Sequence, residues 1–548
     1  MATSKQPDYT TYSHADLLRR VTELEAQLRR YNRAAQGISE EPEKYRKKPK
    51  KPNVPFDPSR YNTRLIALKF AYLGGNYNGL EHHTNNTTPL PTVEEELWKA
   101  LRKTRLILPD FGGKPENEIC WDGCEYSKCG RTDRGVSAFG QVIGIKVRSC
   151  KPKEKDPIVN GANSAQSAGI QEVVMTADET SADDESVAAP TWDPIRDELS
   201  YIQLLNRVLP TDIRVLAWCP DPPPDFSARF NCKERRYRYF FTNPAYAAVP
   251  GSEVGRLNIE KMQAAAKKLE GLHDFRNLCK IDASKQITNF ERRIFHAGIH
   301  QYKRDHVKDS PELYYFEVRG SAFLWHQVRD MVAIMFLVGQ GYEQPEIVDH
   351  LLDIEKCPGK PSYDMADDRP LVLWDCIFPD AAQLSERDHD SSNVEGTPVG
   401  YTDAIDWIYV GNEGGRDPSK RVLSGVDDGK YGSNGIMDSL WSLWRQRKMD
   451  EVLAGSLMEM VALMGGNQPA AAVSLHNGEL IGSVDQVKPE RSDRVFDGSE
   501  RPRTVGRYVP LSQRKMVDAP ELVNARYASR RGMALRPKNA EADADADE

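Results

Sequence analysis

The chain has 548 residues, of which 28% are charged and 39% hydrophobic, and its formal net charge is −7. This length allows two or three domains with substantial cores, and nine cysteines are too few for a secreted disulfide scaffold. No apolar run approaches the roughly 18 residues of a membrane span, and the N-terminus lacks the apolar core of a signal peptide, so we expect a soluble intracellular protein.

The negative charge is concentrated in two stretches. Residues 156–193 hold eight acids and residues 541–548 hold five, and neither stretch contains a lysine or arginine. The rest of the chain therefore carries a formal charge of +6, which permits a polyanionic partner.

Residues 1–58 are expected to form a helix followed by a basic linker. Apolar residues recur at spacings of four and three from Leu17 to Leu28, which predicts an amphipathic helix over 13–33. This helix either pairs with a partner or folds back on the body. The basic run at 44–51 contains a proline and is compatible with a nuclear-import signal, a phosphate-binding arm or a solubilising linker.

Residues 59–225 are expected to form a first α/β unit in the order βαββαβ. Alternating and helical apolar patterns predict strands over 64–72, 125–129, 141–148 and 213–218, and helices over 92–101 and 199–209. Within this unit, residues 151–193 are rich in Ala, Ser, Asp and Glu, which predicts a disordered acidic insertion in a loop.

A loop before the third strand of this unit carries Cys-Gly-Arg-Thr-Asp-Arg-Gly-Val-Ser-Ala at 129–138. It places Asp133 between Arg131 and Arg134 and has a glycine on either side of the trio. Glycines let a backbone approach a ligand closely, and neighbouring cations keep a carboxylate ionised as nucleophile or base. Taken alone, the pattern is more typical of an ordinary turn with a local salt bridge.

Residues 226–380 repeat the order βαββαβ. The patterns predict strands over 235–242, 293–302, 313–319 and 371–378, and helices over 258–270 and 322–338. We therefore expect an α+β fold of two ferredoxin-like units with a central cleft between them. Residues 381–548 are expected to form an extension with helices over 436–463 and a disordered acidic tail.

Arg329 lies on the predicted helix of 322–338, on a face that it shares with Trp325, Val332, Ala333 and Phe336. A guanidinium on this apolar face is expected to be buried, so it requires an acidic partner. Either a nearby acid provides one, or Arg329 pairs with Asp133 across the cleft. Arginine suits the second role because its planar fork binds a carboxylate through two hydrogen bonds.

Cations alternate with aromatic residues in the strand over 235–242. Arg236 and Arg238 share one face and Tyr237 lies on the other, a pattern that favours RNA binding over an ordinary half-buried strand. Removing the charge of either arginine is expected to weaken RNA binding and its salt dependence. Further substrate-binding candidates are Arg134, Lys146, Arg148 and Arg229.

Motifs for metal-dependent or nucleotide-dependent chemistry are absent from the sequence. There is no acidic cluster for a two-metal site, no phosphate-binding loop, no dinucleotide fingerprint and no nucleophile motif to accompany His273 or His326. Cys120, Cys124 and Cys129 do not complete a zinc set, because no Cys-x-x-Cys pair or matching histidine accompanies them. We therefore expect no cofactor and no metal.

The segment 129–142 closely resembles the active-site motif of the TruA-type tRNA pseudouridine synthases. Further likenesses follow in the family's order at 210–213, 226–230, 236–239, 271–275, 323–329 and 371–373. The lead-in at 126–129, the N-terminal helix and the segment 508–511 look most like the eukaryotic branch that modifies positions 38 and 39 of the anticodon stem-loop. Residues 80–83 and the acidic insertion depart from the family's pattern.

The resemblance implies that Asp133 is the catalytic carboxylate in isomerising uridine to pseudouridine, acting on a base flipped out of its stack. It implies that Arg131 helps to displace the base, that Tyr237 packs on the uracil and that Arg329 pairs with Asp133. Leu371 would form a wall of the pocket. The sequence leaves open whether Asp133 attacks the ribose, attacks the base or removes a sugar proton.

The resemblance also implies a homodimer that binds tRNA without a cofactor or metal. We expect it in the nucleus and cytoplasm. The alternative is a catalytically silent RNA-binding or RNA-folding protein on the same scaffold. The presence of Asp133, Arg131, Tyr237 and Arg329 together weighs against that alternative, because a binding protein has no need of a buried ion pair at this loop.

Overall fold

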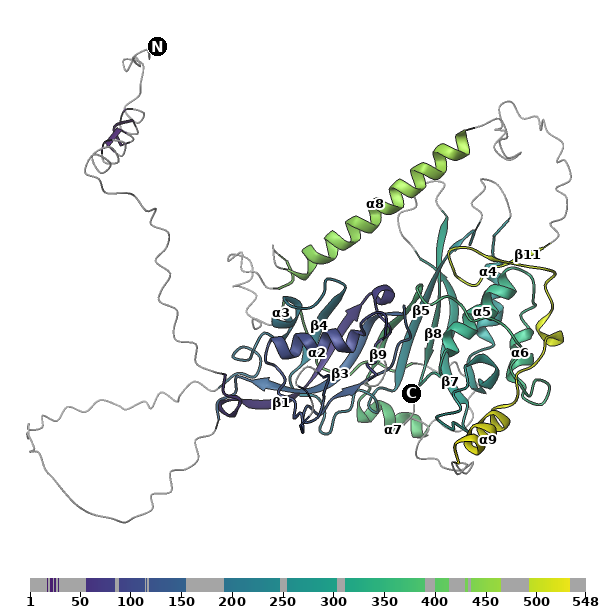
Figure 1. The fold of residues 1–548 in the computed structure, drawn as a ribbon, viewed down its shortest axis with the longest axis horizontal. Helices are drawn as coiled ribbons and strands as arrows, with labels where there is room; N and C mark the ends of the chain where they lie inside the picture. The colour runs from purple at the N-terminus through teal and green to yellow at the C-terminus, as the bar shows by residue number, and fades with distance from the viewer. Residues whose placement is uncertain are drawn as a thin grey trace, which may run out of the picture. The chain divides into compact units, whose positions relative to one another are not determined.

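A computed structural model describes residues 56–532, with gaps at 84–87, 114, 116–117, 154–191, 247–253, 303–310, 390–399, 413–428, 432–434 and 465–491, and some positions between 17 and 28. Those N-terminal positions are helical, with exposed apolar side chains. The basic run at 44–51, most of the predicted acidic insertion and the acidic tail lie outside the described residues. The described residues from 59 onward belong to one compact unit (Figure 1).

One mixed sheet forms the framework of this unit, in the strand order β10-β4-β1-β3-β9-β5-β8-β7-β6, with short β2 paired to β3. Its strands are β1 (Asn62–Tyr72), β2 (Ser127–Lys128), β3 (Ser137–Ser149), β4 (Ile213–Cys219), β5 (Glu234–Asn243), β6 (Gly271–Asp274), β7 (Glu291–Gln301), β8 (Glu312–Gly320), β9 (Leu371–Ile377) and β10 (Ile408–Tyr409). A separate hairpin joins β11 (Asp493–Val495) to β12 (Arg503–Val505).

The two halves of the sheet join between β3 and β9. This is the one parallel pair among the strands of the described chain, with Ser137 opposite Val372 and Ala138 opposite Leu373. The strands of both halves thus belong to one continuous sheet. Because β3 follows the Asp133 loop and β9 begins at Leu371, this seam places the loop of the first half beside Leu371 of the second half.

Helices on the sheet help to bury two apolar clusters, one in each half (Figure 1). Those that contribute residues to the clusters are α2 (Val93–Lys103), α3 (Tyr201–Asn206), α4 (Ile259–Lys267), α5 (Gln327–Gly339) and α6 (Ile347–Leu352). The described chain also contains α7 (Ala381–His389), α8 (Ile436–Leu463) and α9 (Pro520–Arg531), and α8 has many exposed apolar side chains. No helix in the described part of the chain combines the length and hydropathy needed to cross a membrane.

Side chains cap the N-termini of α2 and α4. The Thr92 hydroxyl accepts a hydrogen bond from the backbone N–H of Glu95 at 3.2 Å, and the Asn258 side chain accepts one from that of Lys261 at 2.9 Å. Each satisfies a donor that the first turn of a helix would otherwise leave unpaired. These helix starts are therefore set by local sequence.

The second half differs from the predicted βαββαβ order. It contains an additional short strand, β6, and an additional helix, α6. Helix α5 begins at Gln327 rather than at 322, because His326 has a left-handed backbone with φ of 63° and stands at the N-terminal cap. This turn directs Trp325 and His326 toward the Asp133 loop.

The Asp133 loop, residues 129–136, is fastened to the segment that follows β1. The backbone N–H of Leu80 donates to the carbonyl of Thr132 at 3.1 Å, and the Thr132 hydroxyl lies 2.6 Å from that of Tyr72. Gly79 has a φ of +84°, and a Cβ atom there would lie 2.6 Å from the Thr132 carbonyl oxygen. The approach thus requires glycine at 79.

Gly79→Ala is expected to lower the free energy of unfolding by about 1–3 kcal/mol, because it combines positive φ with a backbone clash. The matched control is Gly75→Ala, where a Cβ meets no atom within 4 Å; it should change stability by less than about 0.5 kcal/mol. Urea unfolding of both variants measures the difference. Equal stability of the two would contradict the tight approach of the loop.

Candidate active site

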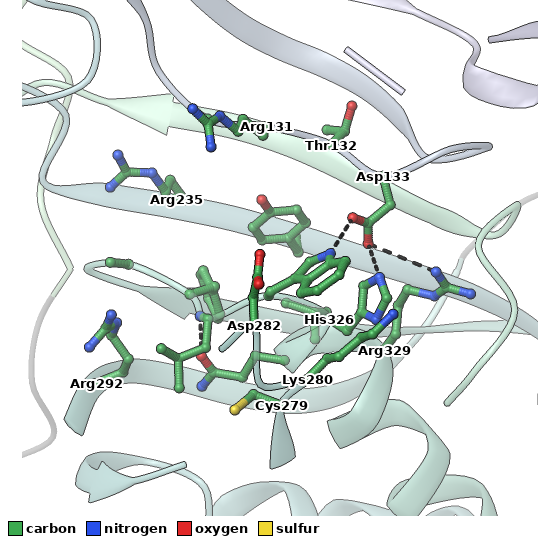
Figure 2. Close-up of a pocket in the computed structure, with 18 of the residues that line it drawn as sticks. Arg131, Thr132, Asp133, Arg235, Cys279, Lys280, Asp282, Arg292, His326 and Arg329 are labelled. Carbon is green, nitrogen blue, oxygen red and sulfur yellow. Dashed lines mark hydrogen bonds and ion pairs between the residues drawn. The ribbon is translucent and has the colours of Figure 1, made fainter. Parts of the chain in front are cut away.

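A cavity of about 750 Å³ opens beside the seam and is lined by residues of both halves. The first half contributes the Asp133 loop, and the second half contributes β5, the segment 279–282, the turn into α5 and the start of β9. Figure 2 shows Asp133 projecting into this space opposite His326 and Arg329. The pocket is therefore assembled from segments more than 200 residues apart.

Three groups from the turn into α5 surround the Asp133 carboxylate (Figure 2). Trp325 Nε1 donates a hydrogen bond to Oδ1 at 3.3 Å. His326 Nε2 lies 3.4 Å and Arg329 Nη1 lies 3.8 Å from Oδ2. The predicted pairing of Asp133 with Arg329 is thus present, and Trp325 and His326 are partners that the sequence reasoning missed.

Arg329 is held in place by contacts beyond Asp133. Its side chain is 9% exposed, and Nε donates to the carbonyl of Ala366 at 2.8 Å. Nη2 lies 3.9 Å from Oδ2 of Asp368, which comes from the segment just before β9. Because α5 is buried along its whole length, the guanidinium has little freedom to leave the two carboxylates.

Burial raises the pKa of Asp133 above its usual value, although the positive charge of Arg329 and the hydrogen bond from Trp325 act against the rise. Burial, together with the positive charges of Arg329 and Lys280, lowers the pKa of His326 to about 3. The imidazole is therefore neutral near pH 7, and its 3.4 Å contact with Asp133 is not an ion pair.

The side chain of Arg131, in the same loop, points away from the Asp133 carboxylate (Figure 2). Its Nε lies 2.9 Å from Glu81 Oε2, and Lys128 Nζ lies 3.0 Å from Glu81 Oε1. Figure 2 shows Arg131 extending on the side of Arg235, away from the Asp133 carboxylate. Glu81 belongs to the segment that departs from the family's pattern, and this departure was the sequence signal that could have drawn attention to it.

Tyr237 and Leu371 both line the pocket. The Tyr237 ring stands edge-on to Phe323, with ring centroids 5.1 Å apart, and Leu371 is buried at the start of β9. Arg235 lies two residues before Tyr237 on the same face of β5; its guanidinium donates to the carbonyls of Ser321 at 2.7 Å and Cys129 at 3.0 Å. Strand alternation could have identified Arg235, which the sequence analysis did not select.

The structure brings only some of the predicted substrate-binding cations to the pocket. Arg134 and Arg229 line it. Lys146 and Arg148 do not: the Lys146 ammonium lies 2.7 Å from Glu125, and Arg148 Nε donates to the carbonyl of Arg105 at 2.9 Å. Substrate binding by these four residues stays a prediction.

Arg236 and Arg238 also lie outside the pocket lining, because they alternate with Tyr237 along β5. Arg236 Nε lies 2.7 Å from a carboxylate oxygen of Glu234. The Arg238 guanidinium lies 3.9 Å from the ring centroid of Trp374. A role in RNA binding stays a prediction for both, and it would involve a surface other than the pocket.

Comparisons with known proteins agree with this site. A family model described as tRNA pseudouridine synthase matches residues 265–379. The tRNA pseudouridine(38/39) synthase of Saccharomyces cerevisiae is 41% identical over 391 residues, covering 69% of this chain and 74% of the relative. The human protein of that name is 40% identical over 392 residues, covering 69% of each chain. The chain belongs to the tRNA pseudouridine synthase family.

A more distant similarity covers the same region. The tRNA pseudouridine synthase A of Methanosarcina mazei is 27% identical over 288 residues, which is 53% of this chain and 76% of the relative.

The geometry gives the Asp133 carboxylate of this synthase two properties that a nucleophile or base needs. The partners on Oδ1 and Oδ2 fix its orientation, and the raised pKa makes the ionised group more basic than an ordinary aspartate. Among the described residues, two groups could hold a metal ion: Cys129 with Cys232 and Cys376, and His296 with His300 and Glu317. Neither includes Asp133.

Catalysis by ionised Asp133 is expected to decline in acid with an apparent pKa above the usual aspartate value. Arg329→Gln removes the cation that lowers this pKa, so the acidic limb of the pH–rate profile should move to higher pH. Single-turnover rates measured across the acidic range test the shift, with Arg134→Gln as a control that should leave the limb unchanged. An unmoved limb in Arg329→Gln would show that Arg329 does not tune Asp133.

Proposed function

We propose that this synthase converts uridines 38 and 39 in the anticodon stem-loop of tRNA to pseudouridine. Relatives from yeast, cattle and human, each 40 or 41% identical over 69% of this chain, are named tRNA pseudouridine(38/39) synthases. The observation that carries the proposal is the half-buried Asp133, 29% exposed, held by Trp325, His326 and Arg329 in a pocket lined with cations.

In the proposed reaction the target uridine leaves its stack and enters the pocket, because its reacting atoms are unreachable inside a helical stem. Asp133 acts at the ribose, at the base or on a sugar proton while the bond between N1 and C1′ breaks. The uracil turns, C5 bonds to C1′, C5 loses its proton and N1 gains one. Product and substrate are therefore isomers, and the reaction consumes no co-reactant.

Other pocket residues have roles in handling the base. Tyr237 packs on the uracil and Leu371 walls the pocket, as their positions in the lining allow. Arg131, oriented by Glu81, takes the place of the flipped base. Arg134 and Arg229 are suited to phosphate contacts, because each places a cation at the lining.

Asp133→Ala is expected to reduce pseudouridine formation by at least about 10³-fold, because the reaction loses its acting carboxylate. Binding of tRNA should change by less than about threefold, since phosphate contacts dominate affinity. The matched control is Asp282→Ala, which removes another acid from the lining and should retain most activity. Chemical mapping of pseudouridine in unmodified tRNA gives both rate and position.

Two results of this mapping would contradict the proposal. Full activity in Asp133→Ala would exclude the proposed role of Asp133 in the mechanism. Pseudouridine at other positions, with positions 38 and 39 unmodified, would exclude the substrate assignment but not the family.

We also propose that the synthase is a homodimer joined through α8. Apolar side chains occur all round this 28-residue helix, which is about 42 Å long. The exposed ones are Met437, Leu440, Trp441, Trp444, Met449, Val452, Leu453, Leu457, Met458, Met460 and Val461. An exposed apolar surface of this extent needs a partner to cover it.

The charges on α8 favour a second copy as that partner. The midpoint of the helix falls between Met449 and Asp450. The basic residues Arg447 and Lys448 lie just before the midpoint, and the acidic Glu451 lies just after it. Two copies in antiparallel contact about this point would therefore place opposite charges together, as a twofold interface requires.

Leu453→Glu combined with Leu457→Glu is expected to shift the dimer to monomer in sedimentation velocity, with at least about a tenfold weaker self-association. The control Gln446→Glu adds one charge to the same helix at a polar position and should leave the dimer intact. A wild-type monomer at micromolar concentration, or a dimer unaffected by the double variant, would exclude this interface. Binding of α8 to tRNA or lipid instead would assign it another partner.

The two halves of the sheet are proposed to be ferredoxin-like units. The strands of each half can be counted from first to fourth in chain order, with β6 left out. In both halves their order across the sheet is fourth, first, third, second: β4-β1-β3-β2 in the first half and β9-β5-β8-β7 in the second. The same order in both halves supports two copies of one unit, with β6 added to the second.

We propose that the synthase is present in both nucleus and cytoplasm, with import directed by the basic run at 44–51. Replacing Lys47, Lys48, Lys50 and Lys51 with alanine should remove a fluorescent fusion from the nucleus. Alanine at Arg526, Arg530 and Arg531, a second basic group, is the control and should leave the distribution unchanged. Unaltered nuclear signal in the lysine variant would contradict the assignment.

A further inference from the structure

Three buried cysteines from separate segments meet directly behind the Asp133 loop. Cys129 opens the loop, Cys232 precedes β5 and Cys376 lies in β9. Each is less than 5% exposed, and their sulfur atoms all lie within 4.8 Å of one another. The sequence analysis compared Cys129 with Cys120 and Cys124, its neighbours in the chain, whereas the fold groups it with cysteines about 100 and 250 residues away.

The dimensions of this group, the cysteine trio, suit a thiophilic metal ion. A triangle with 4.8 Å sides has its centre about 2.8 Å from each corner, so a central ion lies within that distance of each sulfur. A zinc–thiolate bond is about 2.3 Å long. Each sulfur atom would need to move about half an ångström toward the ion to form its bond, and no strand would have to move.

The net charge of the site favours a divalent ion over a monovalent one. Three thiolates and one divalent ion carry −1 together, and Arg235 contributes +1 beside them. Its guanidinium donates to the carbonyls of Cys129 at 3.0 Å and Cys232 at 3.4 Å. A buried group with no net charge avoids the desolvation cost of an uncompensated ion, whereas a monovalent ion would leave −1 uncompensated.

We propose that Cys129, Cys232 and Cys376 bind one zinc ion through their thiolates, with a water molecule from the pocket as the fourth ligand. Cys129 and Cys232 line the pocket, which provides the path for the ion and the water. Every thiol that is protonated before binding releases its proton to solvent as the zinc–sulfur bond forms. No oxidation or reduction takes place.

The zinc site would position residues used in catalysis without contacting the substrate uridine. Cys129 lies four residues before Asp133, Cys232 lies five before Tyr237, and Cys376 lies five after Leu371. One ion would thus fasten together the three segments that supply the carboxylate, the stacking ring and the pocket wall. This inference stands apart from the proposed tRNA positions, because metal content is independent of substrate.

The test begins with the metal content of the full-length protein, purified under reducing conditions without chelators from cells supplied with zinc. Inductively coupled plasma mass spectrometry should find about one zinc per chain in the wild type. Cys376→Ser should retain less than about a tenth of that amount. The control Cys357→Ser changes a buried cysteine outside the trio and should keep its zinc.

A second measurement on the wild type does not depend on the folding of a variant. Removal of zinc by a chelator should lower the unfolding temperature by about 5 °C or more, and restored zinc, but not magnesium, should reverse the change. Cobalt in place of zinc should give the intense visible absorption of thiolate-bound tetrahedral Co²⁺. Zinc-free wild type that does not respond to added zinc, or a disulfide within the trio in fresh protein, would overturn the proposal.

Discussion

The parallel contact between β3 and β9 is the constraint on which the active site depends. Only two residue pairs form it, yet it joins the two halves of the sheet immediately beside the Asp133 loop and Leu371. With the loop fixed there, the turn into α5 brings Trp325, His326 and Arg329 to the carboxylate. A relative displacement of the halves by one residue would separate Asp133 from these partners.

The pocket balances two opposing requirements of a catalytic carboxylate. Partial burial raises the pKa of Asp133 and makes it a stronger base, but burial alone would also favour its protonated form. Arg329 and Trp325 limit that rise, while neutral His326 lies 3.4 Å from the carboxylate without adding a charge. Asp133 is therefore more basic than an exposed aspartate and can still ionise, whereas full burial would favour its protonated form.

Contacts on two sides hold the Asp133 loop in place. Gly79 and Thr132 hold its backbone against the segment after β1, and Glu81 holds Arg131 away from the carboxylate. On the other side, the cysteine trio brings together the loop, the segment before β5 and strand β9. Residues that would not touch the substrate thus hold the residues that act on the base. These contacts limit the motion of the reacting groups.

The sequence by itself determined the elements whose causes are local: the caps of α2 and α4, the strands β1 and β3, and the Asp133 motif with its family. The apolar face around Arg329 predicted a buried cation with an acidic partner, and the family resemblance implied that this partner is Asp133. Only the tertiary structure decided the seam, the Glu81–Arg131 contact, the turn at His326 and the cysteine trio. These join segments up to about 250 residues apart, and neither spacing nor periodicity encodes which distant residues meet when two sheets combine.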